Sequence, residues 1–211
     1  MKVLLTGYGP FKKKNRREVK ENISARIIQE ILKGRKEKGR QISGIVLPVE
    51  WQAAEEIFER HFFDYSPDIV ISMGHAAGYP ALTLEKRYFN IARGLDNKKR
   101  KRKGGIIKPD GDDFYLTNVD ISKIGDRLNG KKIPAKVHDG RKGMDFLCNF
   151  AGYLSAYHCR KVSAKAKYLF IHVPAPEDVP YPVSFSGIKE VIDFLAKTDN
   201  QAKKIGKTGQ L

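Results

Sequence analysis

A cysteine and a histidine in two separate segments are the residue types that thiol catalysis requires. Cys148 lies in FLCNFAGYLSAYHC (residues 146–159), near the start of an expected helix. His172 ends the apolar run KYLFIHV, just before Pro174 and Pro176. A helix N-terminus and a neighbouring imidazole both lower the pKa of a thiol, and the thiolate is the form that attacks a carbonyl. Active groups of α/β proteins gather at the carboxyl ends of strands, so the two side chains could meet there.

A third group is needed to orient the histidine, and Glu85 in the segment ALTLEKRYFN is the candidate. From the pattern alone, each of the three residues has an ordinary alternative. Cys148 could be a small hydrophobe of the core, His172 a structural residue at a strand end, and Glu85 an outward-facing carboxylate.

These residues must be positioned by strands and helices that alternate along the chain. Apolar runs predict strands over residues 2–6, 42–49, 67–73 and 167–173. Residues 81–90 alternate more and fit a strand or an extended segment, and residues 135–137 are a candidate edge strand. Helical spacing of apolar residues predicts helices over residues 19–32, 50–63, 121–128, 146–159 and 184–195. Such alternation is typical of an α/β protein, a three-layer α/β/α sandwich. Because there is no internal repeat or linker, we expect a single domain over residues 1–211.

The composition agrees with a soluble protein that needs no covalent staples. Hydrophobic residues make up 41% of 211, which is enough for a sizeable core. Two cysteines cannot form a disulfide framework, which favours a reducing compartment. The N-terminal apolar run is too short for a signal peptide, and no run approaches the roughly 18 apolar residues of a membrane helix. We therefore expect a cytoplasmic protein without a membrane partner.

The charge is strongly positive and concentrated in two clusters. The 40 Lys and Arg residues exceed the 24 Asp and Glu residues by 16. One cluster spans residues 12–17, and the other is KKRKRK at 98–103, inside a polar, Gly-rich loop expected over 94–113. Basic runs bind nucleic acid or other acidic partners, or are simply solvated loops. Neither cluster carries the interleaved aromatic residues of a base-stacking surface.

Four motifs, taken in order, resemble those of the pyroglutamyl peptidase I family. KVLLTGYGPF resembles the opening strand and TGFxPFGG, FLCN the cysteine motif, and FIHVPAPED the histidine motif HVPxxPEQ. Residues 67–90 resemble the segment with Gly-x-Ala-x-Gly, then Ser/Thr-x-Glu-Arg/Lys and a later Asn. The matching residues are Gly74, Ala76, Gly78, Thr83, Glu85, Lys86 and Asn90. The resemblance runs from Lys2 to about Leu195.

The resemblance implies a cysteine peptidase with the triad Cys148, His172 and Glu85. It also implies a mixed, mostly parallel central sheet, a homo-oligomer that is often a tetramer, and peptides with N-terminal pyroglutamate as substrates. No metal or cofactor is expected. The residues matching the family's substrate site are Tyr8, Phe11, His75, Arg93, Phe146 and Leu147.

The chain departs from the family pattern around this pocket. Lys12 and Lys13 replace Gly-Gly, His75 stands where Gln is common, and Tyr79 stands where Arg is common. The counterpart of the Asn in the following Asn-Pro is uncertain, with Asn22 as one choice. Asp145, three residues before Cys148, could oppose the thiolate or cap the helix.

Three further expectations follow. If the basic loops near residues 12–17 and 94–113 border the pocket, acidic peptides should be preferred. The alternative function is that of a weak or inactive relative which binds nucleic acid or an acidic partner through these loops. A metal site built from His75, His138, His158 and Cys159 is disfavoured, because no pair has the usual spacing of zinc ligands.

Overall fold

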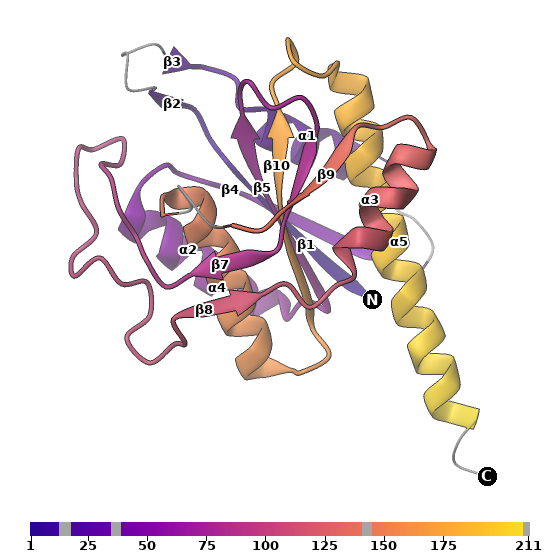
Figure 1. Ribbon diagram of the computed structural model, residues 1–211. Coiled ribbons are helices and arrows are strands. Elements are labelled where there is room, and N and C mark those ends of the chain that lie inside the picture. Colours follow the sequence, from indigo (N-terminus) through magenta and orange to yellow (C-terminus); the bar gives the residue numbers. More distant parts are fainter. Residues whose placement is uncertain (13–17, 35–38, 141–144, 209–211) are drawn as a thin grey trace.

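A six-stranded mixed sheet organises the chain, in the order β4-β1-β5-β10-β6-β9 (Figure 1). The computed structural model describes residues 1–12, 18–34, 39–140 and 145–208. Neighbouring strands are parallel except β10 and β6, which are antiparallel. The strands are β1 (Lys2–Tyr8), β4 (Gln41–Leu47), β5 (Ile69–Ala76), β6 (Leu82–Glu85), β9 (Ala135–His138) and β10 (Lys167–Pro174). Two short pairs lie outside the sheet: β2 (Phe11–Lys12) with β3 (Glu18–Val19), and β7 (Arg87–Phe89) with β8 (Phe114–Leu116).

Helices cover both faces of the sheet, which confirms the expected three-layer α/β/α sandwich with a mixed, mostly parallel sheet. α2 (Trp51–Tyr65) and α4 (Leu147–Val162) pack on one face. α1 (Ile23–Lys33), α3 (Ile121–Gly130) and α5 (Tyr181–Thr208) pack on the other (Figure 1).

Side chains of the central strands alternate between these two helical layers, as the pleat of a strand requires. In β10, Tyr168 and Phe170 belong to the core under α2 and α4, whereas Leu169 and Ile171 belong to the core under α1, α3 and α5. Both faces of the sheet are therefore buried, which explains why the strands read as unbroken apolar runs in the sequence.

The structure places several element boundaries differently from the sequence patterns. The expected strand over residues 81–90 is split into β6 and β7, which join different partners on either side of Lys86. The closing helix begins at Tyr181 and reaches Thr208, beyond the apolar stripe that ends at Leu195. Within the described residues, no helix combines the length and apolar character needed to cross a bilayer.

Candidate active site

Strand register brings Glu85 and His172 to one face of the sheet. Phe170 of β10 lies directly opposite Glu85 of β6, and His172 lies opposite Thr83. Because directly paired residues share a face, Glu85 and His172 both point toward the α2 and α4 layer. Glu85 is completely buried, and its Oε1 atom lies 2.7 Å from Nδ1 of His172.

Cys148 reaches the same point from α4. It is the second residue of that helix, it is half-buried, and its sulfur is hydrogen-bonded to His172. On β5, Gly74 is the partner of His172 in the sheet. A Cβ atom on residue 74 would lie 2.8 Å from Sγ of Cys148, so the glycine leaves the space that the sulfur occupies.

The charges around His172 favour its protonated form. Burial alone would lower the pKa of this imidazole, but the attraction and hydrogen bond of the Cys148 sulfur and those of Glu85 outweigh it and raise the pKa to about 10. At neutral pH His172 is therefore an imidazolium, placed between the sulfur of Cys148 and the carboxyl group of Glu85. A cysteine and an imidazolium with an orienting acid are the components of covalent acyl transfer.

The sequence matches the pyroglutamyl peptidase family over residues 1–183. A pyrrolidone-carboxylate peptidase of Pyrococcus furiosus is 35% identical over 85% of this chain and 84% of its own. Pyrrolidone-carboxylate peptidase 1 of Saccharolobus solfataricus is 30% identical over 97% of this chain and 99% of its own.

This chain belongs to the pyroglutamyl peptidase family. The fold gives the same answer, since a crystal structure of the pyrrolidone carboxyl peptidase of P. furiosus has a TM-score of 0.83. The two chains are 31% identical, and the match covers 94% of this chain and 100% of the chain in that structure. The family is one of cysteine peptidases, and the comparisons indicate pyroglutamyl peptidase function rather than the alternative of a basic binding protein.

Two residues expected in the substrate site of this family member are buried beside the cysteine. Tyr8, at the end of β1, donates a hydrogen bond through its hydroxyl to the carbonyl oxygen of Leu147. Both side chains belong to the core under α2 and α4. Tyr8 and Leu147 therefore support the start of α4 from the core side of the helix.

The other expected substrate residues are more accessible. Phe11 and His75 are half-buried, and their rings lie edge to face with centroids 5.7 Å apart. Phe146 is also half-buried and packs edge to face on Trp51 at 5.3 Å. Arg93 is exposed, and its backbone N–H donates to the carbonyl oxygen of Asp145 over 2.6 Å. The structure thus pairs Phe11 with His75, and it holds Arg93 close to the residues that begin the cysteine motif.

Positions that depart from the family pattern have definite places in the structure. The ring of Tyr79 lies 5.5 Å from the His172 imidazole, and the ammonium of Lys136 lies 4.9 Å from the Tyr79 centroid. Asn22 is the N-cap of α1, and its side-chain amide donates to Gly9 in the first loop over 3.0 Å. The N-cap of α4 is Phe146, which makes no side-chain cap bond, so of the two roles considered for Asp145 that of the N-cap is not the one observed.

Asn149, which follows the cysteine, was not singled out from the sequence as a functional residue. It is buried, accepts a hydrogen bond from the N–H of Phe89, and donates to the carbonyl oxygens of Phe89 and Ile91. These three bonds tie β7 to the first turn of α4. The FLCN motif is a recognisable signal for this role, since its asparagine is adjacent to the nucleophile.

The loop over residues 94–113 is basic, but α2 neutralises part of its charge. Arg102 and Lys108 both pair with Glu55, at 2.7 and 2.8 Å, and Lys98 pairs with Glu50 at 2.6 Å. Burial acts against the ionised form of Glu55, but its bonds to these two cations hold the pKa of the carboxyl below its usual range. The second cluster expected from the sequence, residues 12–17, lies almost entirely outside the described residues.

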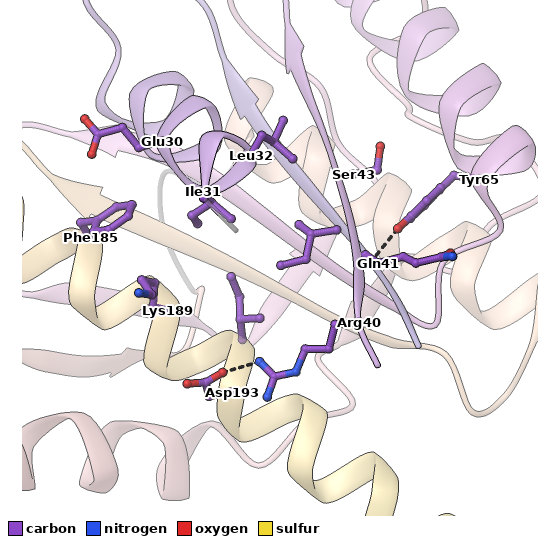
Figure 2. A pocket seen from close by; sticks show the side chains of 13 residues that line it. Glu30, Ile31, Leu32, Arg40, Gln41, Ser43, Tyr65, Phe185, Lys189 and Asp193 are labelled. Carbon is purple, nitrogen blue, oxygen red and sulfur yellow. Dashed lines mark hydrogen bonds and ion pairs between the residues drawn. The ribbon is translucent and has the colours of Figure 1, made fainter. Parts of the chain in front are cut away.

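A separate hollow of about 760 Å³ lies between α1, β4 and α5 (Figure 2). The hydroxyl of Tyr65 donates to the carbonyl oxygen of Gln41 there over 2.7 Å, and Arg40 pairs with Asp193. Neither cysteine nor histidine is among the residues that line this hollow. It therefore offers neither a thiol nor an imidazole, and the cysteine and histidine lie together at the separate site between β6, β10 and α4.

Proposed function

We propose that this protein removes N-terminal pyroglutamate from peptides through a thioester on Cys148. The observation that carries the proposal is the bonded line from Glu85 through His172 to the Cys148 sulfur. It is assembled from β6, β10 and α4, and no two of its members lie within 20 residues of one another. Such a line has the order of acid, base and nucleophile that thiol acyl transfer needs.

The reaction begins from the thiolate–imidazolium pair. The Cys148 sulfur attacks the carbonyl carbon through which the pyroglutamyl residue is joined to the rest of the peptide. The electrons of that carbonyl π bond move to its oxygen. When the carbonyl re-forms, the C–N bond breaks and His172 gives its proton to the leaving amine. His172 then takes a proton from water, whose oxygen attacks the thioester. Free pyroglutamate leaves, and the thiolate and imidazolium are restored.

The start of α4 is placed to stabilise the oxyanion. The first N–H groups of a helix have no partner within the helix, and the helix dipole favours negative charge there. Phe146 supplies no side-chain cap, and the earliest helical bond into this turn is from the N–H of Phe150 to the carbonyl of Phe146. The N–H groups at residues 147–149 are thus the candidates for the oxyanion hole.

The substrate's lactam ring is neutral, so an apolar slot with few polar contacts suits it. Half-buried aromatic residues that could form such a slot include Phe11, which has His75 beside it, and Phe146. Tyr8 and Leu147 support the slot from the core, and Arg93 stands at its exposed side.

A chromogenic pyroglutamyl amide assay tests this function, and the chain offers a matched control. Cys148→Ala should abolish turnover, because no other group can form the thioester. Cys159→Ala should retain it, because that thiol is buried in the core and burial raises its pKa to about 12. Absence of turnover in the wild type, or its persistence in Cys148→Ala, would exclude the proposal.

We also propose a preference for substrates with acidic residues after the ring. The charged residues that line a cleft of about 490 Å³ beside the start of α2 are Lys98, Arg100, Lys101, Arg102 and Lys103, together with the acids Glu50, Glu56 and Asp96. The loop carrying these cations is tied to the first loop by Asn97, whose amide donates to Pro10 over 3.1 Å. A positive rim near the pocket would raise the association rate of anionic peptides.

The comparison of pyroglutamyl-Glu and pyroglutamyl-Lys peptides tests this preference. The ratio of their kcat/KM values should exceed one at low salt, fall at high salt, and fall in the variant Lys101→Glu/Lys103→Glu. Equal values without salt dependence would refute the preference and leave the peptidase function intact.

Two further expectations concern assembly and compartment. Assembly as a homo-oligomer, with a tetramer as the state implied by the family, is supported by exposed apolar side chains such as Phe63 and Val162. Light scattering after gel filtration tests it. A reducing, cytoplasmic location is supported by the two free thiols, Cys148 and Cys159, and cell fractionation tests it.

A further inference from the structure

Glu85 is held by two imidazoles rather than one. Its Oε1 atom lies 2.7 Å from Nδ1 of His172, and its Oε2 atom lies 2.7 Å from Nδ1 of His138. An ionised carboxylate only accepts hydrogen bonds, so each Nδ1 atom must carry the proton. Both oxygens of a completely buried charge are therefore satisfied by histidine side chains.

Strand register fixes the contact between His138 and Glu85, as it fixes the contact between His172 and Glu85. β9 pairs in parallel with β6, and His138 is the register partner of Glu85. The carbonyl oxygen of His138 accepts from the N–H of Lys86 over 2.9 Å, which fixes the backbone on both sides of the pair. Gly140 then turns the chain with φ of +73°, where an added Cβ would meet the carbonyl oxygen of Arg87 at 2.9 Å.

The energetic reason for the contact is the burial of the carboxylate. A buried charge with an unpaired oxygen is costly, and the side chain would turn to find another donor. Rotation of the Glu85 carboxylate would move Oε1 away from His172 and release the ring that must face the Cys148 sulfur. His138 itself is 40% exposed on its side chain, so it acts from the solvent edge of the site.

We propose that His138 is a positioning residue of the peptidase, which holds Glu85 in the rotamer that orients His172. This inference rests on the proposed function and adds a fourth member to the line of three. His138 bonds to Glu85 from the solvent edge of the site, so its removal should lower kcat through the orientation of His172 and leave KM nearly unchanged. A displacement of about 1 Å in a catalytic group costs on the order of 10²-fold in rate, so a loss of roughly tenfold to a hundredfold is expected.

Three substitutions at residue 138 and one beside it separate positioning from packing. Asparagine carries an N–H donor near the place of Nδ1, whereas leucine fills similar space without a donor. His138→Asn should keep kcat within about fivefold of the wild type, and His138→Leu and His138→Ala should show the full loss. Val137→Ala is the matched control on the same strand, since that side chain is exposed and its register partner is Leu84 rather than Glu85.

Two measurements keep this test independent of the proposed function. Activity on a pyroglutamyl amide gives kcat and KM, provided that Cys148→Ala is inactive. The rate of alkylation of Cys148 by iodoacetamide, followed by peptide mass spectrometry, reports the thiolate–imidazolium pair even if no amide is hydrolysed. The expected result is slower alkylation in His138→Leu and a near wild-type rate in His138→Asn. Equal rates in all three variants and the wild type would overturn the role of His138, as would equal losses in the asparagine and leucine variants.

Discussion

The sulfur atom of Cys148 occupies the space beside Gly74, so residue 74 has no room for a side chain. A Cβ atom on residue 74 would lie 2.8 Å from the Cys148 sulfur and 2.9 Å from Cζ of Phe170. Neither distance is tolerated by atoms that are not bonded to each other. The β5 strand thus places a glycine beside His172 because the thiol stands over it.

Gly74→Ala should therefore reduce activity by displacing the sulfur from the imidazole. We expect kcat to fall by on the order of 10²-fold, the effect of a misplacement of about 1 Å. Gly125→Ala in α3 is the control, because its new methyl group would meet nothing closer than 3.9 Å, and alanine favours a helix by up to about 1 kcal/mol. Steady-state kinetics and thermal unfolding of both variants check this, and full activity in Gly74→Ala would contradict the geometry.

The pH dependence of activity should report the proton on His172. Burial would lower the pKa of this ring, but its interactions with the Cys148 sulfur and with Glu85 outweigh burial and raise the pKa to about 10. Above that pH the ring has no proton for the leaving amine, so kcat/KM should fall on the alkaline side near pH 10. The same sign applies to stability: the contribution of the imidazolium is complete below the unfolded pKa of about 6.5 and is lost as the pH rises through about 10.

Glu85→Gln tests the origin of that shift. Removal of the carboxylate takes away one of the two negative partners of His172, so the alkaline limb should move to lower pH. Because the neutral amide also weakens control of the tautomer, we expect kcat to fall by about 10² to 10⁴-fold. The measurement is the profile of kcat/KM against pH for the wild type and for Glu85→Gln. If the alkaline limb lies at the same pH in both, Glu85 does not stabilise the imidazolium.

Asn149 should matter for stability through β7. Asn149→Ala leaves an N–H and two carbonyl oxygens of Phe89 and Ile91 without their partner, at about 1–3 kcal/mol for each unpaired buried group. We expect the free energy of unfolding to fall by roughly 2–5 kcal/mol. Asn129→Ala loses two similar bonds to Ala135 at an exposed site and should cost under about 1 kcal/mol. Urea denaturation measures both, and equal losses would refute the role of burial.

The sequence predicted the layers and the sheet because buried strands and amphipathic helices leave strong periodic signals. It could not predict the break at Lys86, since Leu82–Glu85 and Arg87–Phe89 form one continuous β-like pattern. The break depends on pairing with β10 and β8, which are distant in the chain. Long-range pairing of this kind is invisible in a local pattern.

The candidate triad was found because its members carry recognisable motifs, and the structure brings them together. His138 was considered only as a metal ligand, because it lies one residue beyond the strand expected over 135–137. Its contact with Glu85 depends on the register of β9 against β6, which no local signal in the sequence specifies. The ion pairs between α2 and the loop over residues 94–113 were missed for the same reason.

The most direct test of the account is capture of the acyl intermediate. Wild-type protein mixed with a pyroglutamyl ester and quenched in acid within its first turnover should carry one pyroglutamyl group on the peptide containing Cys148, as read by mass spectrometry. Cys148→Ala should carry none, whereas Cys159→Ala should be labelled like the wild type. A label on any residue other than Cys148, or turnover by Cys148→Ala at the wild-type rate, would contradict the central claim that this sulfur is the nucleophile.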